Sequence, residues 1–177
     1  REIARISHVA RQTLGYYREH ASAVRISLAE LVDDALRIYR PRCDANGIRV
    51  ETRFESTRKV MVRKGEMMQI ISNLITNAIY AMPGGGVLTL TVLDGPDSTA
   101  LSVEDTGEGI PPDALPHVFD AFFTTRKTIG TGIGLFIAKQ FVEGHGGRIK
   151  IESSTDAGAH GTKVTVNLPL ENQYSAG

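Results

Sequence analysis

A strand that ends in an inward-facing carboxylate and then enters two glycines is the feature that most restricts the fold of this chain. Residues 100–104 alternate apolar and polar, which is the period of a half-buried β-strand. Asp105 has the parity of the inward residues, so its carboxylate faces the interior, where it needs hydrogen-bond donors. Gly107 and Gly109 allow the backbone to approach a ligand closely. The stretch fits an Asp-initiated turn, and it equally fits an acceptor for a flat heterocycle that carries an exocyclic amine.

Composition excludes several classes of protein. The 177 residues include 20 basic and 20 acidic side chains, so the net charge provides no general electrostatic attraction to nucleic acid. The single cysteine, Cys43, excludes an internal disulfide framework and fits a reducing compartment, so we expect a cytoplasmic location. No apolar run approaches membrane-spanning length. Because the chain opens on Arg1 within a helical pattern, we expect it to be part of a longer protein. That parent protein can be membrane-anchored.

The first quarter of the chain predicts two helices. Apolar residues recur at three- and four-residue spacing from residue 3 to residue 17, which predicts a helix that packs on another helix. Ser27 and Glu30 have the spacing of a capping box that opens a second helix, and Pro41 should kink or end it. We therefore expect three parts: a helical region and connector at 1–26, an α/β domain at 27–170, and a disordered tail at 171–177.

A helix is predicted over residues 65–82. Its apolar stripe, at three- and four-residue spacing, consists of Met67, Ile71, Leu74, Ile75, Ala78 and Met82. The helix also carries Asn73 and Asn77 one turn apart. Asparagine forms helices poorly because its side chain competes for backbone hydrogen bonds. A solvated polar face is the alternative explanation, although Glu, Lys or Gln would suit such a face better. The pair therefore indicates a function for this face. Alternating patterns predict strands at 48–54, 59–62, 87–93, 99–104, 148–153 and 162–168.

Three glycines, Gly130, Gly132 and Gly134, open another predicted helix. Backbone N–H groups at such a helix start form an anion site. The run matches neither a P-loop nor a dinucleotide fingerprint. An aromatic segment at 119–123 precedes it and should anchor the intervening loop. The histidines show no metal-ligand spacing.

Four segments in one order resemble the motif set of bacterial sensor histidine kinases. Residues 73–78 resemble its asparagine box, 105–109 its first glycine box, 119–123 its phenylalanine box and 130–135 its second glycine box. Residues 161–164 resemble the last glycine motif of the family. The resemblance runs from about residue 48 to residue 169. It implies a Bergerat ATP-binding fold, an α/β (α+β) two-layer sandwich whose mixed sheet is covered by helices on one face and preceded by an N-terminal helix.

The resemblance also implies roles for individual residues. Asp105 accepts from the adenine amine, and Asn77 coordinates Mg²⁺ between the phosphates with Asn73, the implied catalytic residue, beside it. Tyr80 departs from relatives that carry a lysine or another polar residue there. The implied ATP-binding residues are Asn73, Asn77, Tyr80, Asp105, Gly107, Gly109, Ile110, Arg126, Lys127, Gly130, Thr131, Gly132, Gly134, Leu135 and Thr162.

The same resemblance implies partners. These are ATP and ADP, a histidine-bearing dimerisation domain of the same protein, and the receiver domain of a response regulator, in a homodimeric parent. No phosphoacceptor histidine is expected in this chain. His8 lacks the acidic neighbour of the acceptor motif and falls opposite the apolar seam of the first helix.

Three functions follow from the residues and the resemblance. The favoured one is a protein-histidine kinase. The second is an ATP-hydrolysing clamp of the same superfold, whose members carry a glutamate as general base where this chain has Asn73. An amide cannot take a proton, which argues against hydrolysis. The third is a degenerate kinase that senses nucleotide without chemistry.

Overall fold

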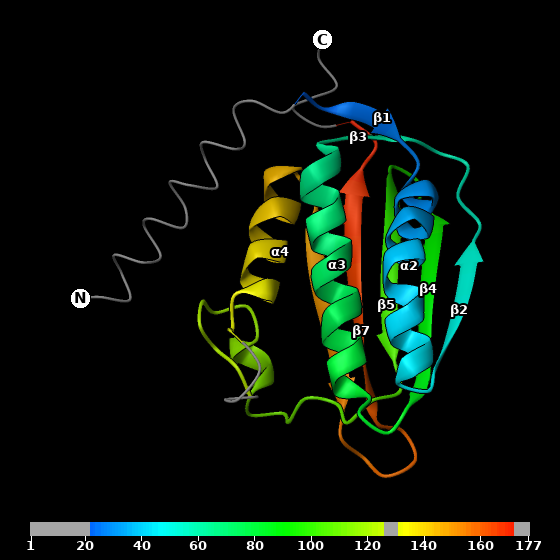
Figure 1. The fold of residues 1–177 in the computed structure, drawn as a ribbon. Coiled ribbons are helices and arrows are strands. Elements are labelled where there is room, and N and C mark those ends of the chain that lie inside the picture. Colours follow the sequence, from blue (N-terminus) through cyan, green and yellow to red (C-terminus); the bar gives the residue numbers. More distant parts are fainter. Residues whose placement is uncertain (1–21, 126–130, 172–177) are drawn as a thin grey trace.

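The computed structural model describes residues 22–125 and 131–171, and it has two layers (Figure 1). One layer is a five-stranded mixed sheet. The other consists of three helices that lie side by side on one face of the sheet, namely α2 (Leu28–Ala45), α3 (Lys64–Ala81) and α4 (Gly134–Gly144). The two-layer α/β sandwich predicted from the sequence is therefore confirmed. The helix predicted within residues 1–21 and the tail from residue 172 lie outside the described residues.

The order of strands brings two distant glycine motifs to one end of the sheet. The strands are β2 (Ile48–Phe54), β4 (Gly86–Asp94), β5 (Ser98–Asp105), β6 (Arg148–Ser154) and β7 (Gly161–Pro169), in the spatial order β2-β4-β5-β7-β6. Only β2 and β4 run parallel, because α3 crosses between them. In the central pair, Asp105 at the end of β5 lies opposite Thr162 at the start of β7.

Alternation along the strands and a three-to-four spacing along the helices build one core. In β5, Leu101 and Val103 face inward and are buried, as is Asp105. The apolar stripe predicted for α3 is also confirmed, since its six residues are all buried: Met67, Ile71, Leu74, Ile75, Ala78 and Met82. Burial of these faces is the main stabilising term of the fold. Among the described residues, no helix combines the length and apolarity needed to cross a membrane.

A short pair of strands lies at the edge of the domain, and the sequence predicted only the second of the two. β1 (Val24–Ile26) pairs antiparallel with β3 (Val60–Val62). Three residues are too few to show a period, so β1 has no recognisable strand pattern in the sequence. This pairing joins β1 to the α/β domain predicted for residues 27–170. The division between residues 26 and 27 itself stays a prediction.

Helix α2 begins where the sequence predicted, but it differs in two details. Ser27 is the N-cap residue, yet its side chain makes no cap hydrogen bond, so the capping-box prediction is wrong. The helix also continues through Pro41 to Ala45. Leu36 and Cys43, on either side of the proline, are 2% and 0% exposed. Burial of this face outweighs the one backbone hydrogen bond that a proline removes.

Candidate functional site

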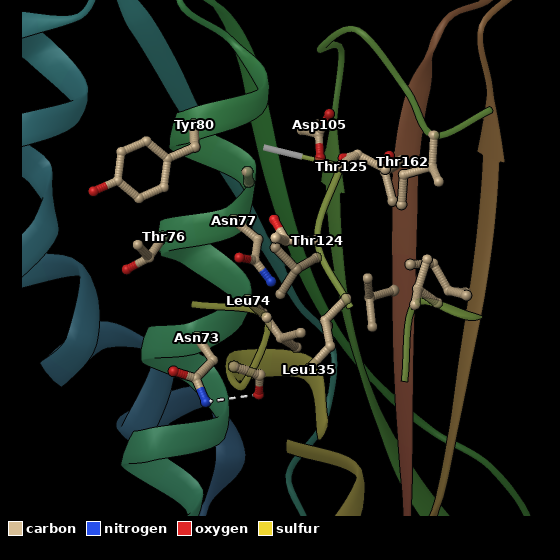
Figure 2. A pocket seen from close by; sticks show the side chains of 18 of the residues that line it. Asn73, Leu74, Thr76, Asn77, Tyr80, Asp105, Thr124, Thr125, Leu135 and Thr162 are labelled. Carbon is tan, nitrogen blue, oxygen red and sulfur yellow. Dashed lines mark hydrogen bonds between the residues drawn. The ribbon is translucent and has the colours of Figure 1, made fainter. Parts of the chain in front are cut away.

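A cavity of about 310 Å³ opens between α3, the sheet and the start of α4 (Figure 2). Residues from all four motifs line it, although they lie far apart in the sequence. Eleven of the predicted binding residues are among them: Asn73, Asn77, Tyr80, Asp105, Gly109, Ile110, Thr131, Gly132, Gly134, Leu135 and Thr162. The predicted residues Arg126, Lys127 and Gly130 lie outside the described part of the chain.

Asp105 provides a buried acceptor at one end of the cavity. Its side chain follows the inward parity of β5, and the residue is only 7% exposed. The backbone N–H of Gly107 donates to Asp105 Oδ1 over 2.9 Å. This bond supports a negative charge that burial would otherwise disfavour. The carboxylate has acceptor sites beyond the one that the Gly107 N–H occupies, and Asp105 lines the cavity wall.

The two glycines after Asp105 have different roles. Gly109 lines the cavity at φ +73°, and a Cβ there would lie 1.9 Å from the carbonyl oxygen of Ser154. Gly107 is not among the lining residues, and its Cβ would lie 2.4 Å from the carbonyl oxygen of Ala81 at the end of α3. His160 Nδ1 donates to the Gly107 carbonyl oxygen over 2.7 Å. Gly107 thus seats the loop against α3 and orients its N–H toward Asp105, while only Gly109 forms part of the wall.

The wall opposite α3 carries a pair of hydroxyls. Thr162 lines the cavity, and its Oγ1 lies 2.8 Å from Oγ of Ser153 on the neighbouring strand β6. The backbone N–H of Ile110 donates to the same Ser153 oxygen over 2.8 Å. Sequence reasoning missed Ser153. The available signal was its inward parity in β6, which only the register with Thr162 makes meaningful.

The two asparagines of α3 have different surroundings. Asn73 Nδ2 donates to the carbonyl oxygen of Gly134 over 3.0 Å, the dashed line in Figure 2, and its Oδ1 accepts from Gln69 Nε2 over 3.0 Å. Asn73 therefore ties α3 to the first residue of α4. Within residues 22–125 and 131–171, the Asn77 side chain makes no hydrogen bond. Its amide lines the cavity and can act as a ligand.

The start of α4 is held against the phenylalanine segment. Gly132 has φ +67°, and a Cβ there would lie 2.5 Å from the carbonyl carbon of Phe122. The N–H of Phe122 donates to the Gly132 carbonyl oxygen over 2.9 Å, and Phe122 itself has φ 67°. The helix begins at Gly134, four residues later than the first glycine of the predicted run. The first backbone N–H groups of α4 have no partner within the helix and lie beside the cavity, where they favour binding of an anion.

Tyr80 stands at the rim of the cavity. It is 37% exposed, and the guanidinium carbon of Arg42 lies 4.8 Å from the centre of its ring. In Figure 2 the ring points away from Asp105 and Thr162. Within the described part of the chain, no lysine, arginine or histidine lines the cavity. An anionic ligand therefore needs a helix start or a bound cation for charge balance on these walls.

No cluster of His, Cys, Asp and Glu suited to a metal is found among the described residues. His145 is fully buried, donates from Nδ1 to the Phe141 carbonyl oxygen over 2.7 Å, and accepts at Nε2 from the Arg63 N–H over 3.1 Å. It serves the packing of α4 on α3.

Comparison with known proteins gives one consistent family. The model of the family described as histidine kinase-, DNA gyrase B- and HSP90-like ATPases matches residues 62–172. Sporulation kinase A of Bacillus subtilis is 29% identical over 172 residues, which cover 95% of this chain and 28% of that protein. The sensor histidine kinase ZraS of Salmonella typhi is 30% identical over 175 residues, covering 96% of this chain and 36% of its own length. The chain thus spans about a third of these curated relatives.

Solved structures agree with the sequence relatives. The nucleotide-free catalytic domain of the histidine kinase ThkA superposes with a TM-score of 0.75 at 26% identity, over 84% of this chain and 96% of that one. The mycobacterial sensor histidine kinase MprB gives a TM-score of 0.72 at 29% identity, over 86% and 99% of the two chains. Fold, cavity and relatives lead to one conclusion: the chain belongs to the histidine kinase-, DNA gyrase B- and HSP90-like ATPase family, as a catalytic ATP-binding domain of the sensor histidine kinase type.

Proposed function

We propose that this domain binds ATP in the cavity and supplies the γ-phosphate to a histidine on a dimerisation helix of the same, homodimeric protein. The receiver domain of a response regulator then accepts the phosphate. The observation that carries the proposal is what one cavity brings together. It has a buried carboxylate acceptor at one end. At the other end it has a helix start and the Asn77 amide, which makes no hydrogen bond to the described residues. We place this activity in the cytoplasm, where a lone cysteine stays reduced.

The base end of the cavity suits adenine. Asp105 accepts a hydrogen bond from the 6-amino group, and Gly109 leaves room for the ring because it has no side chain. Apolar side chains from three elements, Leu74, Val103 and Ile151, line the same cavity. They cover the faces of a flat base and exclude water, which strengthens the hydrogen bond to the carboxylate.

The phosphate end suits a triphosphate with Mg²⁺. Asn77 offers an amide oxygen with no hydrogen bond to the described residues, a hard ligand of the kind that Mg²⁺ takes beside phosphate oxygens. When bound, Mg²⁺ neutralises charge on the phosphates. The start of α4, with Thr131, Gly132 and Leu135, provides N–H groups and close backbone approach. We assign Gly130, Arg126 and Lys127 to this end of the site by resemblance to the family alone.

The chemistry left to the chain is positioning. An imidazole nitrogen of the acceptor forms a bond to the γ-phosphorus while the bond from that phosphorus to the β,γ-bridging oxygen breaks, and ADP leaves. Catalysis of such a transfer is mostly alignment and charge stabilisation. Asn73 contributes by tying α3 to Gly134, which sets the start of α4 relative to Asn77.

An ATP-hydrolysing clamp is the second candidate, and Asn73 separates the two. Its amide is hydrogen-bonded at both ends, to Gln69 and Gly134, and it cannot take a proton from water. We therefore expect this chain to bind ATP without releasing phosphate above the uncatalysed rate in a coupled phosphate assay. Steady turnover that Asn73→Ala abolishes would favour the clamp. A parent protein that binds ATP but never forms phosphohistidine would favour a nucleotide sensor.

The magnesium proposal predicts a specific effect of Asn77→Ala. Calorimetry should show that Mg²⁺ strengthens ATP binding to the unchanged chain. In Asn77→Ala, Mg²⁺ affinity in the ATP complex should fall by about tenfold or more, because even supporting groups at metal sites have effects of this size. ATP binding without Mg²⁺ should change little, since the base end is intact.

A matched control is Asn167→Ala, which removes an asparagine side chain of β7 that does not line the cavity. It should keep the full response to Mg²⁺. If Asn77→Ala keeps that response as well, Asn77 is a polar surface residue and the magnesium assignment is wrong.

A further inference from the structure

The hydroxyl of Ser153 stands at the centre of a hydrogen-bond network behind the cavity wall. Its Oγ lies 2.8 Å from the backbone nitrogen of Ile110, 2.8 Å from the carbonyl oxygen of Gly161 and 2.8 Å from Oγ1 of Thr162. Ser153 and Thr162 are also register partners on β6 and β7. One hydroxyl thus joins the loop after β5 to both strands at the end of the sheet.

The number of hydrogens decides the direction of each bond. A serine hydroxyl has one hydrogen to donate and two lone pairs that accept. The Gly161 carbonyl can only accept, so it takes the Ser153 hydrogen. The Ile110 N–H can only donate, so it occupies one lone pair of Ser153. The remaining contact requires Thr162 to donate its hydroxyl hydrogen to the other lone pair.

This arrangement gives Thr162 a defined polarity toward the cavity. A free threonine hydroxyl can turn to donate or to accept, but here its only hydrogen is directed to Ser153. Thr162 lines the cavity and lies opposite Asp105 in the register of β5 and β7. Paired residues of this kind have Cβ atoms about 4.5–5.5 Å apart. The wall therefore presents two hydrogen-bond acceptors next to each other.

We propose that Ser153 is a positioning residue for base selection, which holds Thr162 as an acceptor so that this wall favours an exocyclic amino group over a carbonyl. The inference rests on the proposed function, because it takes the purine to be bound at this wall. An amino group has two hydrogens and can satisfy two neighbouring acceptors. A carbonyl oxygen in the same place faces acceptors only, and the pairing is repulsive.

The test compares two nucleotides that differ at this group. ATP carries an amino group where inosine triphosphate carries a carbonyl. Calorimetry at fixed Mg²⁺ measures the dissociation constant of each, and their ratio is the selectivity. In Ser153→Ala, Thr162 loses its acceptor and can turn its hydrogen into the cavity. The selectivity for ATP should fall roughly three- to tenfold, the worth of one neutral hydrogen bond.

The ratio of the two dissociation constants separates base selection from general damage, because distortion of the cavity weakens the binding of both nucleotides. Ser153→Thr keeps the hydroxyl and should keep the selectivity. Ser102→Ala is a matched control, since Ser102 Oγ lies 3.2 Å from Thr165 Oγ1 in a similar cross-strand pair and neither residue lines the cavity. It should leave the ratio unchanged.

Thr162→Val removes the acceptor itself and should lower the selectivity by a similar factor. Adding Ser153→Ala to Thr162→Val should then lower it no further. If circular dichroism shows Ser153→Ala to be unfolded, the test rests on Thr162→Val and on Ser153→Thr. If the selectivity is unchanged in a folded Ser153→Ala, or in Thr162→Val, the inference is wrong and the proposed function is unaffected. An unchanged chain that binds neither nucleotide contradicts the proposed function, and the inference with it.

Discussion

Replacing Asp105 with asparagine is expected to weaken ATP binding by about ten- to a hundredfold. The substitution keeps the size of the side chain but removes its charge, and it can turn an N–H donor toward the adenine amino group. Loss of a hydrogen bond to a charged group is worth about 1.5–3 kcal/mol. The effect should be large because Asp105 is 7% exposed, so water cannot replace the lost acceptor.

Titration calorimetry with ATP measures this loss, and thermal unfolding checks that the variant is folded. Asp113→Asn provides the control, because Asp113 is an exposed carboxylate in the loop that follows the glycines. It should bind ATP like the unchanged chain. Equal ATP affinity in Asp105→Asn and Asp113→Asn would remove Asp105 from base recognition.

Gly109→Ala is expected to destabilise the domain by about 2–4 kcal/mol, the largest single effect on folding that we predict. Two costs combine at this residue. A side chain at φ +73° is strained by about 1–3 kcal/mol. Its Cβ would also lie 1.9 Å from the Ser154 carbonyl oxygen, so the loop or β6 must move. Movement there also shifts Ser153 and the neighbouring cavity wall.

Chemical denaturation followed by circular dichroism measures the free energy of unfolding. Gly65→Ala is the matched control, since Gly65 lies inside α3 and a Cβ there meets no atom within 4 Å. Alanine is the better helix former, so Gly65→Ala should stabilise the domain by about 0.4–1 kcal/mol. Gly109→Ala with the stability of the unchanged chain would show that the loop can relax freely.

Local patterns in the sequence predicted most of the secondary structure and eleven of the residues that line the cavity. Alternation predicted the strands that carry Asp105 and Thr162, and the three-to-four spacing predicted the buried stripe of α3. Both periods depend on residues that are close in sequence, so a reader of the chain alone can detect them. The ordered motifs then predicted the family, which the comparisons confirm.

Tertiary contacts decided what local patterns could not show. β1 forms only because β3 offers a partner, and α2 continues past Pro41 because residues on both sides are buried. Each outcome depends on segments that meet only after folding, where packing outweighs local propensity.

The same reason applies within the site. The close approach of Gly107 to Ala81 gives it a seating role that its place in a glycine motif does not reveal. Asn73 becomes a link to α4 because Gly134 lies within 3.0 Å of it. Ser153 acquires its role because β6 and β7 align it with Thr162 and the loop brings the Ile110 N–H to its hydroxyl. The sequence motifs indicated eleven of the residues that line the cavity, and the packing of distant segments decided how their hydrogen bonds are directed.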